Sequence, residues 1–266
     1  MIYNKLVVSL LSALAIERQS TTNSVIARYL VTHASDLDDI TIRGVASACN
    51  VGTGSVSRFC REVGFDGFDE LRRAIVETDH SFELANNDSV GTGHNSTDAK
   101  DSFLLRADRH AELVAKSLVL AARSVDQRAL HLLVNDIGSY QKVFVCGMLK
   151  AQAAAVDLQV DLLMQGKFAQ TNVSYAEQLE HIATAQGDEL VVVFSYTGDY
   201  FFSRDLSSAL SRLNRPRIWV VAGANRQQPD YVYGCLLFES QQGQLSHPFQ
   251  LEMISALIAQ EYARRA

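Results

Sequence analysis

The residues with the clearest chemical potential lie in a short polar stretch that begins at Thr53. Hydroxyl groups can bond to bases or phosphates, small residues allow close approach to base edges, and arginine can fork onto guanine or a phosphate. This combination predicts contact with double-stranded DNA. The residues expected to make that contact are Thr53, Gly54, Ser55, Ser57, Arg58 and Arg61.

The elements that must position these residues are two short helices joined by a tight turn. Thr41 can cap a helix over residues 42–48, and Val51 is the one aliphatic residue in the turn that follows. A second helix over residues 53–63 turns its apolar residues inward and its small and basic residues outward. This is the helix-turn-helix pattern, in which the second helix enters the major groove.

Charge alone does not decide between this interpretation and a plain three-helix bundle with solvated arginines. Between residues 50 and 75 four arginines balance four acids. A positive face must therefore come from the arrangement of the charges and not from their excess.

The run over residues 51–71 resembles the RpiR-type (MurR-type) family of transcription regulators. In that family the recognition helix ends in RFC-x-x-x-GF-x-GF-x-x-L, and here the sequence reads RFCREVGFDGFDEL from Arg58 to Leu71. We expect Gly64 to end the helix in a left-handed cap, and Phe65 and Phe68 to pack back on the bundle. One departure is Gly52, which stands where the family usually has a capping serine.

The resemblance implies a sugar-isomerase (SIS) domain after a linker, in which two loops hold the phosphate of a ligand. The first loop has the form GxGxS and the second SxSGxT, and each opens a helix. Backbone N–H groups and helix N-termini attract anions, and hydroxyl groups add further hydrogen bonds to the phosphate. Both loops sit at the carboxyl ends of strands, where ligands of open α/β sheets bind.

This chain changes several of those loop residues. In the first loop Gly147 is kept, but Leu149 replaces the second glycine and Ala151 the serine. In the second loop only the final threonine is replaced, by Tyr200. The residues that the resemblance assigns to the ligand are Gly147, Lys150, Ser195, Thr197 and Gly198.

Two hypotheses follow for this loop pair. In the first, Lys150 replaces the lost hydroxyl with a positive charge, which the helix dipole disfavours unless an anion is bound. The effector is then a sugar phosphate or a related anion, in a pocket narrowed by Leu149 and Tyr200. In the second, Lys150 is simply solvated, the pocket is lost, and the domain only dimerises.

A third possibility is that the domain is a phosphosugar isomerase. That chemistry needs a placed general base, for which Glu177, Glu180, His181 and Asp199 are the candidates. Nothing in their spacing indicates that they form a pair. Fusion to a DNA-binding domain favours binding of a ligand as a signal over its catalytic conversion. We therefore expect no catalytic residues.

The organisation of the chain supports two domains. Residues 1–77 read as helical, residues 78–101 as an acidic linker rich in Asn, Ser, Thr, Gly and Asp, and residues 102–266 as α/β. In the third part, apolar runs at 142–146, 189–194, 218–222 and 235–238 alternate with helical stretches at 103–122, 127–137, 151–165, 201–213 and 248–264. Strands that are apolar on both faces predict a doubly wound parallel sheet between two helical layers.

Bulk composition narrows the class of protein further. With 47% hydrophobic and 20% charged residues, the chain is typical of globular proteins. The apolar run Leu6–Ile16 is too short to span a bilayer and is interpreted as part of a first buried helix. The four cysteines stand singly among apolar neighbours, which favours a reducing cytosol, and the seven histidines form no HExxH motif.

Together these patterns predict a cytoplasmic DNA-binding regulator whose SIS domain responds to a sugar phosphate or similar anion. We expect a homodimer or higher oligomer, since a helix-turn-helix dimer reads two half-sites. No metal, cofactor or membrane partner is expected.

Overall fold

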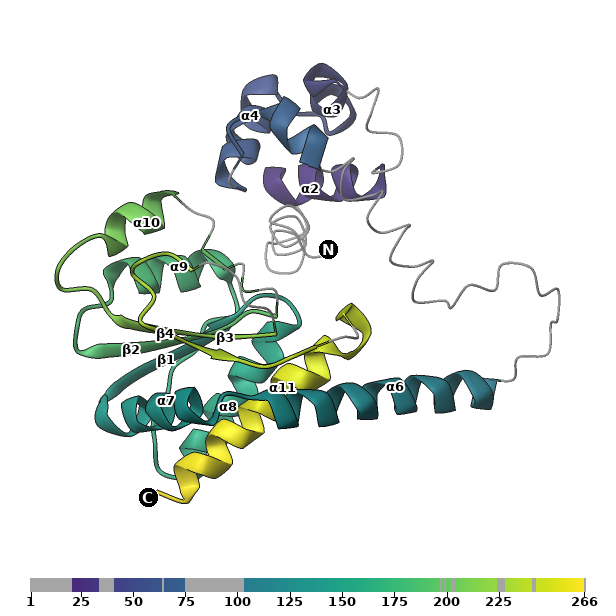
Figure 1. Ribbon diagram of the computed structural model, residues 1–266. Helices are drawn as coiled ribbons and strands as arrows, with labels where there is room; N and C mark the ends of the chain where they lie inside the picture. The colour runs from purple at the N-terminus through teal and green to yellow at the C-terminus, as the bar shows by residue number, and fades with distance from the viewer. Residues whose placement is uncertain are drawn as a thin grey trace. The chain divides into compact units, whose positions relative to one another are not determined.

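The computed structural model describes residues 21–33, 41–63, 65–74, 103–196, 198, 200–201, 204–223, 228–240 and 243–265. The chain forms two compact units, residues 1–98 and 99–266, which are drawn in Figure 1. The helix expected over residues 2–18 and the linker expected over residues 78–101 lie outside the described residues.

The N-terminal unit contains α2 (Thr22–Thr32), α3 (Ile42–Ala48) and α4 (Thr53–Glu62), and residues 68–74 are also helical. The expected cap of α3 is present, since the Thr41 hydroxyl accepts from the Gly44 N–H at 3.1 Å. Gly52 caps α4 without a side-chain hydrogen bond. Apolar side chains from all these helices share one core: Ile26, Ala27, Leu30, Val45, Ala46, Cys49, Val56, Phe59, Cys60, Phe65, Phe68 and Leu71.

The turn between α3 and α4 fixes the angle of the helix pair. Asn50 takes a left-handed conformation with φ 58°, which asparagine tolerates better than most residues. Val51 packs against the core, and its N–H donates to the Ala46 carbonyl at 2.9 Å. After α4, Phe65 and Phe68 are buried in the same core, as the sequence predicts.

The C-terminal unit is built on a parallel sheet of four strands. They are β1 (Lys142–Gly147), β2 (Glu189–Phe194), β3 (Arg217–Ala222) and β4 (Gly234–Leu237), and they lie side by side in that order. Outside β1, Gln170 forms a parallel bridge with Phe144. The expected α/β class with a parallel sheet is therefore confirmed, and each expected strand lies within one residue of the observed bounds.

Helices cover both faces of this sheet (Figure 1). One layer contains α6 (Phe103–Ser124), α7 (Gln127–Ser139), α8 (Ala151–Met164) and α11 (Gly243–Ala263), and the other contains α9 (Tyr175–Thr184) and α10 (Arg204–Leu210). The α9 helix is absent from the elements that the sequence pattern indicates. Its local signal is an N-cap serine, because the Ser174 hydroxyl accepts from the Glu177 N–H at 3.4 Å.

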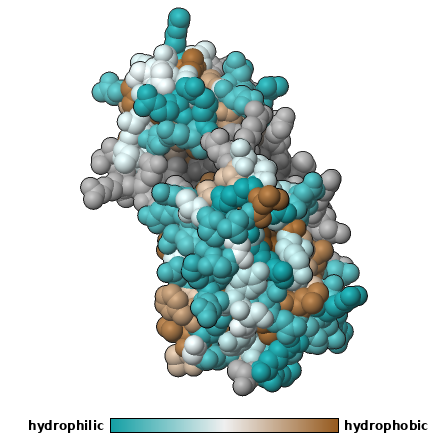
Figure 2. Space-filling model, turned by 90° about the vertical axis from the view of Figure 1, so that its left-hand side faces the viewer, coloured by the Kyte–Doolittle hydropathy of each residue, from teal (hydrophilic) through white to brown (hydrophobic). Residues whose placement is uncertain are grey.

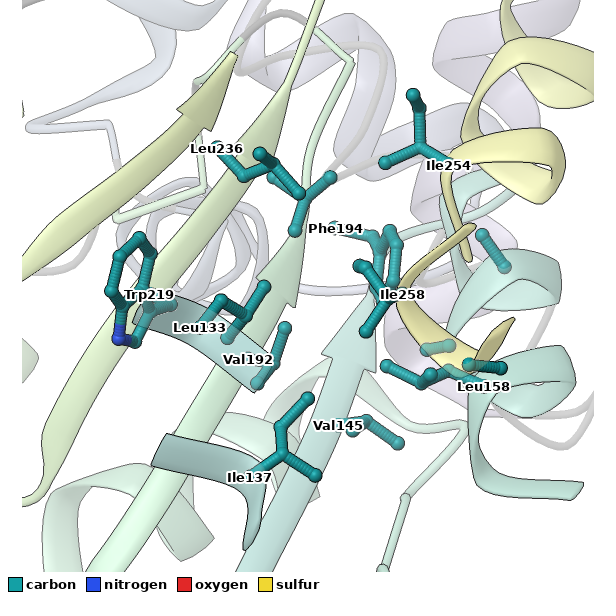
Figure 3. Close-up of a cluster of buried hydrophobic side chains, with 14 of the residues drawn as sticks. Leu133, Ile137, Val145, Leu158, Val192, Phe194, Trp219, Leu236, Ile254 and Ile258 are labelled. Carbon is teal, nitrogen blue, oxygen red and sulfur yellow. The ribbon is translucent and has the colours of Figure 1, made fainter. Parts of the chain in front are cut away.

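The main core lies between the sheet and the layer of α7, α8 and α11 (Figure 3). Leu133 from α7, Leu158 from α8 and Ile258 from α11 are fully buried against alternate residues of the strands. Burial of each such side chain stabilises the fold by about 1.5–3 kcal/mol. The face drawn in Figure 2 is mostly hydrophilic.

None of the described helices combines the length and the hydropathy that a membrane span requires.

Leu133 and its neighbour Leu132 offer a matched test of this core. Leu133 is fully buried, whereas Leu132 is 45% exposed. We expect Leu133→Ala to lower the free energy of unfolding by about 2–5 kcal/mol, because it leaves a cavity between α7 and the sheet. Urea denaturation followed by the fluorescence of Trp219, the single tryptophan of the chain, measures the change. Leu132→Ala is the control, and an equal loss in both variants would contradict the placement of α7.

Candidate functional site

The six residues expected to meet DNA lie on the outer side of α4. Thr53, Gly54, Arg58 and Arg61 are exposed, and Ser55 and Ser57 are half-buried. The opposite side of the same helix buries Val56, Phe59 and Cys60 in the core. The structure therefore gathers the polar and basic residues of α4 on one surface.

The acids near this surface have partners of their own. Glu62 accepts from the Asn23 side-chain amide at 2.7 Å, and Glu70 accepts from the Asp66 N–H at 2.7 Å. Within the described part of the chain, Arg58 has no ion-pair partner, and the Arg61 Nε donates only to the Ser57 carbonyl at 3.3 Å. The positive charge of α4 is thus available to an anion although the local charge count is balanced.

Gly54 has no packing reason to be small. A Cβ atom added at Gly54 would meet nothing within 4 Å. Glycine inside a helix costs about 1 kcal/mol relative to alanine. The internal packing of the domain therefore does not explain this glycine.

The second candidate site lies at the carboxyl ends of β1 and β2. At Gly147 an added Cβ would lie 2.7 Å from the Ala151 carbonyl oxygen and 3.0 Å from that of Phe194. Only glycine therefore allows α8 to start so close to the strands. Leu149 takes the place of the second glycine and adopts φ 54°, so the left-handed conformation is present without the glycine.

Lys150 precedes the first residue of α8 and is exposed. The N–H groups of residues 151–153 already donate to the carbonyls of residues 148–150. An anion at this helix start would therefore interact mainly with the Lys150 ammonium group, which has no ion-pair partner in the described part of the chain.

The second loop begins as a continuation of β2. Ser195 is buried and its N–H donates to the Val221 carbonyl of β3 at 3.0 Å. Gly198 has φ 77°, a conformation that favours glycine, and its N–H donates back to the Ser195 carbonyl at 2.9 Å. Thr197 and Asp199 lie outside the described residues. The helix that follows is shorter than expected, since α10 starts at Arg204 and not at residue 201.

A buried polar network joins the two loops, and the sequence patterns do not indicate it. The Gln152 Oε1 accepts from the Gly147 N–H at 3.1 Å, and the Gln178 side-chain amide donates to the Gly147 carbonyl at 2.9 Å and to the Gln152 Oε1 at 3.0 Å. The two glutamines thus hold both polar groups of the Gly147 backbone. Unlike a metal or acid-base motif, glutamine has no spacing rule that reveals such a role.

Tyr200 closes this network. Its ring is fully buried, its hydroxyl donates to the Gln178 Oε1 at 2.7 Å, and its carbonyl accepts from the Tyr175 hydroxyl at 2.9 Å. Burial raises the pKa of Tyr200 well above its usual range and the pKa of the neighbouring Cys146 thiol to about 12. Both groups are therefore protonated at neutral pH. Tyr200 fastens the loop to α9 and does not serve as a base.

Of the described acid-base candidates, His181 lies away from this end of the sheet. His181 Nε2 lies 2.6 Å from the Glu189 carboxylate, and Glu189 is the first residue of β2, at the opposite end of that strand from Ser195. The His181 ring also stacks on Phe144. Glu177 and Glu180 are exposed. Among the described residues, no group of His, Cys, Asp or Glu side chains is arranged to hold a metal ion.

Comparisons with known proteins agree with this architecture. Residues 10–81 match the model of the rpiR-family helix-turn-helix domain. Over 201 residues the chain is 19% identical to an uncharacterised HTH-type transcriptional regulator of Providencia stuartii, covering 75% of this chain and 68% of the relative.

Two solved structures show the fold. The NanR protein of Vibrio vulnificus, solved in complex with ManNAc-6P, matches with a TM-score of 0.54 and 17% identity, over 98% of this chain and 92% of that one. A putative sugar-phosphate isomerase of Listeria monocytogenes matches with a TM-score of 0.51 and 13% identity, over 62% of this chain and 91% of that one. The chain thus carries an N-terminal helix-turn-helix domain of the rpiR family, followed by an α/β domain with the fold of phosphosugar isomerases.

Proposed function

We propose that this protein is a transcription regulator that binds operator DNA through α4 and whose affinity for DNA is set by a sugar phosphate or similar anion. The observation that carries the proposal is the outer surface of α4, where Arg58 and Arg61 have no carboxylate partner in the described part of the chain. The match of residues 10–81 to the rpiR-family helix-turn-helix model supports the same role for this surface.

The effector site that we propose combines Lys150 with Gly147, Ser195, Thr197 and Gly198. An unpaired ammonium group at a helix start is disfavoured by the helix dipole, and an anion beside it removes that penalty. The similar NanR structure was solved with ManNAc-6P, which is a sugar phosphate. This supports the same chemical class for the ligand here.

Regulation in this proposal requires at least two copies of the chain. A helix-turn-helix dimer reads two half-sites, and an effector changes its affinity only by binding one arrangement of the dimer more tightly than another. We place the contacts between copies in the C-terminal domain, on the α8 and α11 helices. Of the four cysteines, Cys49, Cys60 and Cys146 are buried and all are free thiols, which supports a cytoplasmic location.

Sugar-phosphate turnover is the alternative, because a putative isomerase shares the fold of the C-terminal domain. Against it stands the pairing of His181 with Glu189 at the far end of β2. Incubation of the purified protein with ManNAc-6P, followed by NMR of the sugar, separates binding from conversion.

The role of α4 is tested by Arg58→Ala. A duplex selected from a random-sequence library serves as the probe, and fluorescence anisotropy at fixed salt measures the affinity. We expect the loss of one arginine contact to weaken binding by about 1–3 kcal/mol, or roughly 5- to 150-fold. Arg128→Ala, at an exposed residue of α7, is the control. Equal affinity of both variants would remove α4 from the DNA interface.

Gly54→Ala separates stability from recognition in the same helix. Because an added Cβ meets nothing within 4 Å, alanine should stabilise α4 by up to about 1 kcal/mol. Against the selected duplex we expect weaker binding, since the methyl group prevents close approach. A higher melting temperature with unchanged affinity would show that Gly54 does not face DNA.

The effector site is tested by thermal shift with ManNAc-6P as the probe. A ligand that binds only the folded state raises the melting temperature with dose, by about 2.7 kcal/mol of stability at 100 times its Kd. We expect Lys150→Ala to abolish the shift. Lys116→Ala, at an exposed lysine of α6, should keep it. The proposed role of Lys150 fails if both variants respond like the unchanged protein.

Tyr200→Phe tests the network that fastens the second loop. Without the phenol hydroxyl, the Gln178 Oε1 loses its donor inside the protein, which costs about 1–3 kcal/mol. We expect a lower melting temperature of the C-terminal domain and weaker binding of ManNAc-6P. Tyr233→Phe is the control, because Tyr233 is 55% exposed and lies before β4. Equal effects of the two variants would show that the Tyr200 hydroxyl has no special role.

A further inference from the structure

A cavity lies at the amino ends of the strands, opposite the loops that contain Lys150 and Ser195. It has a volume of about 520 Å³ and is open to solvent. Its wall is formed by the segments that precede β1, β2, β3 and β4 together with the end of α10. The side chains used in the argument below are Tyr140, Arg212, Leu213, Arg215, Arg217 and Tyr233.

The cavity carries an excess of positive charge in a chain whose net charge is −6. Arg217 is neutralised by Asp136, at 2.9 Å, whereas the Arg212 guanidinium donates only to backbone carbonyls, among them those of Ala183 and Ala185. Arg215 is exposed and has no partner in the described part of the chain. Arg215 thus offers free donor groups, Arg212 adds a positive charge whose N–H groups mostly hold backbone carbonyls, and the wall contains one acid, Asp230. Guanidinium groups bind phosphate and carboxylate in a forked geometry.

The same cavity presents apolar and aromatic surface. Leu213 is fully exposed and Tyr233 is 55% exposed. Tyr140 adds a third such side chain to the wall. Large apolar side chains beside unpaired cations form a surface that suits a ligand with both a flat apolar part and an anionic group.

The Tyr233 ring of this wall is held in place by contacts with Arg217 and Trp219. The Arg217 guanidinium lies 4.0 Å from the centre of the Tyr233 ring, and the Trp219 ring packs edge-on against Tyr233. Asp136 fixes this stack, because it accepts from Arg217 and, at 2.8 Å, from the Trp219 indole N–H. A wall ordered in advance reduces the entropy that a ligand loses on binding.

We propose that this cavity binds a nucleoside monophosphate, with the phosphate group hydrogen-bonded to Arg215 beside the positive charge of Arg212, and the base against Leu213 and Tyr233. The volume lies within the range of small-molecule sites, roughly 300–1,000 Å³. A sugar phosphate would use the arginines but leave the apolar wall exposed. The site is separate from the proposed effector site, and the inference does not depend on it.

Isothermal titration of the full chain with AMP tests the proposal. We expect saturable binding of AMP, and binding at least about tenfold weaker for adenosine and for inorganic phosphate, which each lack one half of the ligand. Arg215→Gln and Leu213→Ser should each weaken AMP binding by about tenfold. Neither side chain has a packing role, so both variants should keep the melting temperature of the unchanged protein.

Two controls make the result specific to this cavity. Arg128→Gln removes an exposed arginine of α7 that the cavity does not include, and Lys150→Ala alters the proposed effector site. Both variants should bind AMP like the unchanged protein. The proposal is overturned if AMP does not bind, if Arg215→Gln binds it unchanged, if inorganic phosphate binds as tightly as AMP, or if Lys150→Ala removes the binding.

Discussion

The close approach of α8 to the ends of β1 and β2 is the constraint on which the C-terminal domain depends. No side chain fits at Gly147, where a Cβ would lie 2.7 Å from the Ala151 carbonyl oxygen. This contact fixes where α8 starts, and so it fixes the position of Lys150. It also leaves the Gly147 N–H and carbonyl inside the protein, where they must be hydrogen-bonded. Gln152 and Gln178 satisfy them, and Tyr200 satisfies Gln178 in turn.

This chain of buried hydrogen bonds accounts for the tyrosine in the second loop. The resemblance to sugar-isomerase domains implies hydroxyl groups at positions 151 and 200, where this chain has alanine and tyrosine. In the structure the tyrosine hydroxyl points to Gln178 on α9 and holds the loop after β2 against that helix. Since a buried network is stable only when each member is bonded, these residues form one unit with the backbone of Gly147.

The helix-turn-helix domain has a positively charged surface on α4 although its arginines do not outnumber its acids. Four arginines and four acids lie between residues 50 and 75. The acids bond within the domain, as Glu62 does with Asn23 on α2, and Arg58 remains exposed without such a partner in the described residues. At the amino end of the parallel sheet Arg217 is neutralised by Asp136 whereas Arg215 is not, and Lys150 at the carboxyl end also has no carboxylate partner among the described residues.

The sequence by itself determined the elements whose signals are local. The Thr41 cap, the bounds of β2 and the burial of Phe65 and Phe68 follow from propensity and hydrophobic period, which act over a few residues. Only the tertiary structure decided which distant residues meet. Gln178 lies 31 residues from Gly147 in the chain, and Arg217 lies 81 residues from Asp136. Such contacts depend on how the strands are ordered and how the helices pack on them, and no spacing along the chain encodes these.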